Sequence, residues 1–73
     1  MDGVVVVYSK SHCPQCVIAK NKLDAVGIEY EEVRVDLDQS ARSMIMGMGF
    51  RSVPVIFKSG EPVKLEDLLL QVN

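Results

Sequence analysis

A C-x-x-C motif directly after an apolar, β-branched run is the feature that most constrains the fold of this chain. Residues Gly3–Tyr8 read G-V-V-V-V-Y, which is typical of a strand buried on both faces. Cys13 and Cys16 follow a short polar stretch. Pro14 suits the first turn of a helix, because the N–H that proline lacks would be unpaired there anyway. The motif therefore predicts a strand, a tight loop and a helix that begins at the cysteines.

Apolar residues after the motif recur at helical spacing. Ile18, Ala19, Leu23 and Val26 follow a period near 3.6 residues, which predicts an amphipathic helix with these side chains on its packed face. Gly27 is typical of the residue just beyond a helix, because glycine adopts the left-handed conformation there at little cost.

Further strands and helices follow in regular order. In chain order they are a strand over Ile28–Val35, a helix over Gln39–Met48 closed by Gly49, a strand over Val53–Phe57, a turn over Lys58–Glu61, a short returning strand over Pro62–Lys64 and a helix over Leu65–Val72. The order is β-α-β-α-β-β-α, which is an α/β class. The first β-α-β unit implies parallel strands and a right-handed crossover.

Length and charge limit the classes of function. The 73 residues form a single predicted domain over 1–73, and the net charge is −2, from eight Lys plus Arg against ten Asp plus Glu. This composition has no basic field for a nucleic-acid backbone. The longest apolar runs, Val4–Tyr8 and Leu68–Leu70, are far shorter than the roughly 20 residues that span a bilayer. We therefore expect no nucleic-acid and no membrane partner.

The cysteine pair indicates dithiol chemistry. A bridge closing so short a loop stabilises a fold by only roughly 2 kcal/mol, so it is a poor structural staple. Without a recognisable signal peptide, a lone C-x-x-C favours a reducing compartment, and we expect a cytoplasmic protein. At a helix start Cys13 is the expected nucleophile, helped by the positive charge of Lys10, and Cys16, inside the first turn, is the expected resolving thiol.

Two other interpretations of the cysteines stay open. The first is a metal or iron–sulfur module, although zinc needs about four ligands and the only other soft candidate, His12, is adjacent in sequence. The second is an inert interaction module, against which the intact motif argues.

Elsewhere, the methionines Met44, Met46 and Met48 around Ile45 are more typical of helix packing than of a contact surface. The Glu31–Glu32 pair is expected on a solvated strand face.

The chain resembles the glutaredoxin family. The resemblance is carried by Y-S-K-S-H-C-P-Q-C at 8–16, by G-F-R-S-V-P-V-I-F at 49–57 and by the order of elements between them. It implies the minimal thioredoxin fold, a four-stranded mixed sheet flanked by three helices, and a monomeric dithiol–disulfide oxidoreductase. It also implies a cis peptide bond at Pro54, packed beside the disulfide. Within the family the chain is most similar to NrdH-type redoxins and short phage glutaredoxins, which carry electrons to ribonucleotide reductase.

The resemblance also implies the site residues and partners. The residues that shape the site are Lys10, Pro14, Gln15, Val53 and Pro54, and the candidates for binding glutathione or a partner are Lys10, Arg51, Val53, Glu66 and Asp67. No bound cofactor is expected beyond the redox-active cysteine pair. The substrate is a protein disulfide, and the electron source is thioredoxin reductase or glutathione. Val63–Lys64 occupies the place where glutaredoxins usually carry Gly-Gly, which favours thioredoxin reductase over glutathione.

Overall fold

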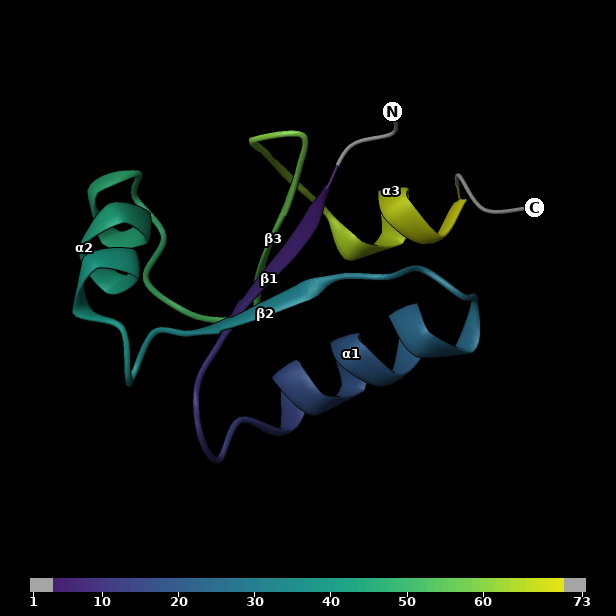
Figure 1. Ribbon diagram of the computed structural model, residues 1–73, viewed down its shortest axis with the longest axis horizontal. Helices are drawn as coiled ribbons and strands as arrows, with labels where there is room; N and C mark the ends of the chain where they lie inside the picture. The colour runs from purple at the N-terminus through teal and green to yellow at the C-terminus, as the bar shows by residue number, and fades with distance from the viewer. Residues whose placement is uncertain (1–3, 71–73) are drawn as a thin grey trace.

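The computed structural model describes residues 4–70 and confirms the predicted order of elements (Figure 1). The elements are β1 (Val5–Ser9), α1 (Pro14–Ala25), β2 (Glu31–Arg34), α2 (Gln39–Gly47), β3 (Val55–Lys58), β4 (Glu61–Val63) and α3 (Leu65–Leu70). They form a four-stranded mixed sheet and three helices, as expected. The last two residues predicted for the C-terminal helix, 71 and 72, lie outside the described residues, as does residue 3 of the first predicted strand. None of the described helices is long and apolar enough to cross a membrane.

The strands are ordered β2-β1-β3-β4. β1 pairs in parallel with β2, with Tyr8 opposite Val33, and antiparallel with β3, with Tyr8 opposite Val55. A tight turn joins β3 to β4, and the two strands pair antiparallel. The parallel pair confirms the β-α-β crossover that the sequence predicts. β1 is therefore a central strand, and the loop after it leads directly to the cysteines.

Each face of the sheet has its own hydrophobic core. On one face β1, β3, α1 and α3 contribute Val5, Val7, Ile56, Leu23 and Leu68. The core on the other face consists of Val35, just after β2, Ile45 of α2, and Val55 and Phe57 of β3, with Tyr8 packed edge-on against Phe57. Figure 1 shows α2 on one side of the sheet and α1 and α3 on the other. The layered arrangement explains why β1 needs apolar residues on both of its faces.

Two strands are shorter than predicted, for identifiable reasons. The strand expected over Ile28–Val35 begins only at Glu31, because the backbone N–H of Ile28 bonds to the carbonyl of Leu23 at 3.0 Å and closes α1. Gly27 adopts φ +79° at that turn, which confirms its predicted role. The strand expected from Val53 begins at Val55, where the pairing with β1 ends.

The packed face of α1 differs from the prediction. Cys16, Ala19 and Leu23 are buried, but Ile18 and Val26 are 51% and 39% exposed. Residues at i, i+3 and i+7 share one side of a helix, and the adjacent Ile18 is turned about 100° away. The buried side of α1 is therefore the line of Cys16, Ala19 and Leu23, and Ile18 lies outside it.

The helix-packing interpretation of the α2 methionines is wrong. Only Ile45 of this group is buried, whereas Met44, Met46 and Met48 are 42%, 55% and 49% exposed. Because a helix of nine residues covers the sheet with one narrow side, a run of alternating apolar residues places several of them in solvent.

Candidate active site

The two cysteines of the motif lie at the start of α1 and are joined as a disulfide. Their Cα atoms are 5.2 Å apart, within the usual range for a bridge. Cys13 is the N-cap residue of α1, with extended backbone angles, and Pro14 is in the first turn. The structure thus places the motif at the helix start, where the sequence predicts it.

The sulfur of Cys13 points at the helix N-terminus. Its Sγ accepts a hydrogen bond from the backbone N–H of Cys16 at 3.2 Å. The first N–H groups of a helix have no partner within the helix, and together with the helix dipole they favour a negative charge. The Sγ of Cys13 therefore lies at the positive end of the helix dipole.

The two cysteines differ in their access to solvent. Cys13 is 8% exposed, whereas Cys16 is 1% exposed and packs with the buried side of α1. Thiol–disulfide exchange requires the attacking sulfur to reach its target. Cys13 is the more accessible of the two.

The segment before β3 lies beside the disulfide. The carbonyl oxygen of Val53 is 3.9 Å from Cys13 Sγ, although forty residues separate them in the chain. The Val53–Pro54 peptide bond is cis, and both side chains are half-buried. The structure therefore joins the two motifs that carry the family resemblance into one site.

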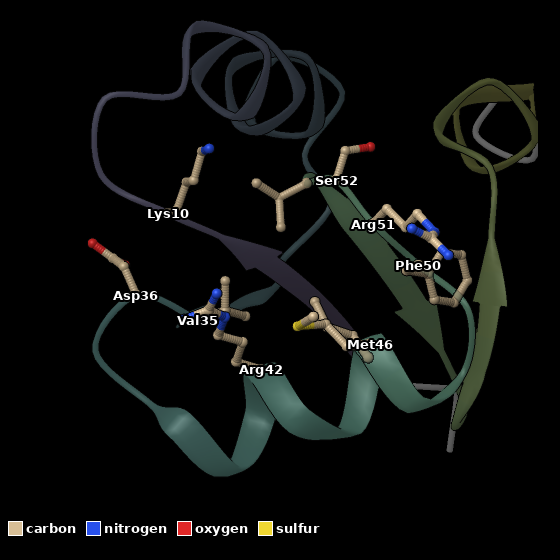
Figure 2. A pocket seen from close by; sticks show the side chains of 10 residues that line it. Lys10, Val35, Asp36, Arg42, Met46, Phe50, Arg51 and Ser52 are labelled. Carbon is tan, nitrogen blue, oxygen red and sulfur yellow. The ribbon is translucent and has the colours of Figure 1, made fainter.

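A hollow of about 240 Å³ brings together three of the predicted binding residues, Lys10, Arg51 and Val53 (Figure 2). Arg42, on α2, also lines it and was not among the residues that the sequence singled out. Its apolar lining includes Met46 and Phe50 from the α2 side. The hollow is also lined by the carboxylate of Asp36, so its three cations exceed its acidic groups by two, which suits a ligand that carries carboxylates next to apolar groups.

The other predicted residues are placed differently. Pro14 lines an open hollow with both cysteines, and the side chain of Gln15 is exposed. Glu66 lines a separate hollow beside Pro54, on the α3 side. Asp67 is exposed in the first turn of α3 and lines none of the hollows described here. The two acidic residues are thus apart from the basic ones.

Glu32 was predicted as part of a solvated strand face, and it is exposed, as Glu31 is, but its carboxylate also makes specific contacts. Its carboxylate accepts hydrogen bonds from Lys20 Nζ at 2.7 Å and from the hydroxyl of Ser9, which is fully buried, at 2.6 Å. The Lys20 bond, followed by the Ser9 bond, lowers the pKa of Glu32. Glu32 and Lys20 line the same open hollow as the cysteines. The parallel pairing of β1 and β2 brings Glu32 near Ser9, and α1 supplies Lys20; no local pattern in the sequence indicates this grouping.

Metal ligands do not gather around the cysteines. Among residues 4–70, no group of three or more His, Cys, Asp and Glu side chains is placed to hold a metal ion.

The fold and the disulfide at a helix start define a redox protein of the thioredoxin-like class. The glutaredoxin family model matches residues 5–63, and the chain belongs to the glutaredoxin family of thiol–disulfide oxidoreductases. Two relatives are glutaredoxin-like proteins NrdH. That of Lactococcus lactis subsp. lactis is 38% identical over 55 residues, which cover 75% of this chain and 76% of the relative. That of Salmonella typhimurium is 35% identical over 52 residues, which cover 71% of this chain and 64% of the relative.

Solved structures agree with this fold. The thioredoxin-like protein BC3987 superposes with a TM-score of 0.81 and 32% identity, over 93% of this chain and 99% of that one. The NrdH-redoxin from Escherichia coli superposes with a TM-score of 0.80 over 94% of this chain and 93% of that one. Its identity is 22%, so this second similarity concerns the fold alone.

Proposed function

We propose that this protein is a dithiol electron carrier that reduces protein disulfides, with Cys13 as nucleophile and Cys16 as resolving thiol. The observation that carries the proposal is the unequal placement of the cysteines. Cys13 caps the helix and is the more exposed, while Cys16 is enclosed one turn further on. The partner is a protein with a reducible disulfide, and the relatives named NrdH favour ribonucleotide reductase as that partner.

The reaction proceeds by two exchanges. The Cys13 thiolate attacks one sulfur of the substrate disulfide, forms a mixed disulfide with it and expels the other substrate sulfur as a thiolate. The Cys16 thiolate then attacks the sulfur of Cys13, which releases the reduced substrate and leaves the Cys13–Cys16 disulfide. Two electrons pass to the substrate, and a reductant restores the dithiol.

The helix start favours both directions of this cycle. A stabilised thiolate gains in ionised fraction but loses intrinsic nucleophilicity, so the rate of attack rises only a few-fold. The same stabilisation makes Cys13 a better leaving group in the return half of the cycle, when a second thiol of the reductant displaces it from the mixed disulfide between Cys13 and the reductant. That combination suits a carrier, which has to receive electrons as well as donate them.

For the electron source we propose thioredoxin reductase. Glutathione carries a γ-glutamyl carboxylate that needs backbone N–H donors at close range, and paired glycines allow that approach. In this chain the side chains of Val63 and Lys64 line the hollow beside Pro54, so Cβ atoms stand where a glycine pair would leave space. A reducing compartment, the cytoplasm, fits this source.

Glutathione-dependent reduction is the second candidate, and one observation favours it. Lys10 and Arg51 line one hollow together with Val53, whose carbonyl lies near the sulfur of Cys13. Two cations at that place suit a carboxylate of a small thiol ligand.

A steady-state comparison decides between these sources. Reduction of a disulfide substrate is measured with NADPH and thioredoxin reductase, and separately with glutathione and glutathione reductase, at equal protein concentration. We expect faster turnover with thioredoxin reductase. Efficient turnover with glutathione and little with thioredoxin reductase would make the second candidate correct. Ribonucleotide reductase turnover, with this protein as the only dithiol, tests the proposed partner.

A further inference from the structure

The loop that delivers Cys13 is held by a single acidic residue of a distant strand end. Between the end of β1 and the start of α1 lie only residues 10–13. Ser11, in the middle of this loop, donates two hydrogen bonds to Asp36 Oδ2, from its backbone N–H at 3.2 Å and from its hydroxyl at 2.5 Å. Asp36 follows β2 and is 25 residues away in the chain.

Arg34 completes the contact from the last position of β2. Its Nε donates to Asp36 Oδ1 at 3.4 Å, and its Nη2 donates to the hydroxyl of Ser11. The two oxygens of Asp36 are therefore both engaged, one by the loop and one by the strand. The Ser11 hydroxyl bond is the largest cause of an Asp36 pKa of about 2, so the carboxylate is charged at every physiological pH. We call Ser11, Arg34 and Asp36 the loop latch.

The position of this loop determines the surroundings of the reactive sulfur. Cys13 is two residues beyond Ser11, and His12 between them has φ +57°, a left-handed conformation that costs a non-glycine residue free energy. Cys13 then needs its extended N-cap angles for Sγ to meet the N–H of Cys16. A loop freed at Ser11 can relax His12 and move Cys13 out of this geometry.

We propose that Asp36 is a positioning residue for Cys13, which acts through Ser11 to hold the sulfur at the helix N-terminus. This inference rests on the proposed role of Cys13 as the attacking thiol. Identifying which cysteine of the reduced wild-type protein is alkylated first tests that role by itself. If Cys16 reacts first, the role of Cys13 is wrong, whatever the latch variants do.

The sign of the effect separates positioning from simple electrostatics. A carboxylate close to a thiol disfavours the thiolate by charge repulsion. If charge were its only effect, removal of the Asp36 carboxylate would make Cys13 more reactive at neutral pH. Loss of positioning has the opposite effect, because the thiolate loses the N–H of Cys16. The two readings of Asp36 therefore predict changes in opposite directions.

The test measures the alkylation rate of Cys13 in reduced protein as a function of pH. In Asp36→Ala we expect the alkylation rate of Cys13 at neutral pH to fall about 3- to 10-fold. A change of this size corresponds to part of the free energy of an N-cap hydrogen bond. The midpoint of the pH–rate profile should move upward. Asp36→Asn keeps an oxygen that can accept both Ser11 bonds, and should recover most of the wild-type rate.

Asp38→Ala is the matched control. Asp38 is also an aspartate that accepts a backbone N–H, that of Ala41 at 3.0 Å, but it caps α2 and not the cysteine loop. It should lower the melting temperature and leave the Cys13 profile unchanged. Ser11→Ala, which removes only the hydroxyl, should shift the profile in the same direction as Asp36→Ala by a smaller amount, and serves if Asp36→Ala does not fold. An unchanged or faster Cys13 in both Asp36→Ala and Ser11→Ala would overturn the inference, as would an equal slowing in Asp38→Ala.

Discussion

Two segments flank the disulfide, and they are held in different ways. The loop of residues 10–13 is tied to the end of β2 by the side chains of Ser11 and Asp36. The segment before β3 approaches the sulfur through the backbone carbonyl of Val53, while the side chains of Arg51 and Ser52 are exposed and make no hydrogen bond within the described residues 4–70. The tied loop positions the reactive atom, and the free side chains are available to a partner.

Neutralising one cation in each segment should reveal the difference between the two segments most strongly. Arg51 lines only the hollow on the α2 side, whereas Lys10 also lines the hollow that contains both cysteines. We expect Arg51→Gln to raise KM for the anionic glutathione disulfide about tenfold, through loss of a charge-assisted bond. A neutral disulfide such as hydroxyethyl disulfide should be reduced as by the wild type. Lys10→Gln should slow both substrates.

Measured kcat and KM for each substrate check this expectation. If Arg51→Gln slows the neutral disulfide as much as the anionic one, Arg51 acts on the cysteines and not on the ligand. If Lys10→Gln affects only the anionic substrate, Lys10 acts on the ligand as Arg51 does, and the two segments do not differ in their effect on the cysteines.

A pair of serine variants compares the two segments by stability. Ser11→Ala should lower the free energy of unfolding by about 1 kcal/mol, because it removes a hydroxyl bonded to a charged group. Ser52→Ala should change it by less than about 0.5 kcal/mol, the usual range for surface positions without such contacts. Urea unfolding of both variants at neutral pH gives the two values. Equal losses would show that the segments are held alike.

Acid should loosen the β2 side of the site in a defined range. The pKa of Asp36 is lowered from 3.8 to about 2, first by the Ser11 hydroxyl, and that of Glu32 is lowered, first by the Lys20 hydrogen bond. A lowered pKa in the folded state means that the stabilisation is present above the unfolded pKa and is lost as pH falls through the folded one. Stability should therefore decline as pH falls from about 4 towards 2.

The decline is measured by urea unfolding between about pH 6 and pH 2. Glu32→Gln and Asp36→Asn should each flatten it. Glu31→Gln is the control, because Glu31 is the exposed neighbour of Glu32 and makes no side-chain hydrogen bond within residues 4–70. A decline that is the same in all variants would place the acid sensitivity elsewhere in the molecule.

Local patterns in the sequence predict the elements because each depends on its own residues. Pro14 and Gly27 bound α1 as predicted, and Gly49 has φ +97° just after α2. Helix ends depend on capping residues within a few positions, so the sequence displays them directly. The disulfide pair and the Val53–Pro54 segment could also be predicted, because each is carried by a short motif.

Contacts between distant side chains could not be predicted in this way. Ser11 meets Asp36, and Ser9 meets Glu32, only because β1 and β2 pair in parallel at one register. A shift of one residue between these strands would turn Glu32 to the other face of the sheet, away from Ser9. The exposure of Ile18 has a similar origin, since the way α1 packs on the sheet buries the side that carries Cys16, Ala19 and Leu23.

Trapping of the mixed disulfide shows whether Cys13 is the attacking thiol and Cys16 the resolving one. Each single variant, Cys13→Ser and Cys16→Ser, is incubated with the same disulfide-containing protein substrate, and covalent adducts are separated without reductant. Cys16→Ser should accumulate the adduct through Cys13, because no second thiol remains to release it. Cys13→Ser should form none and should not reduce the substrate. An adduct that accumulates with Cys13→Ser and not with Cys16→Ser would show that the roles of the two cysteines are reversed.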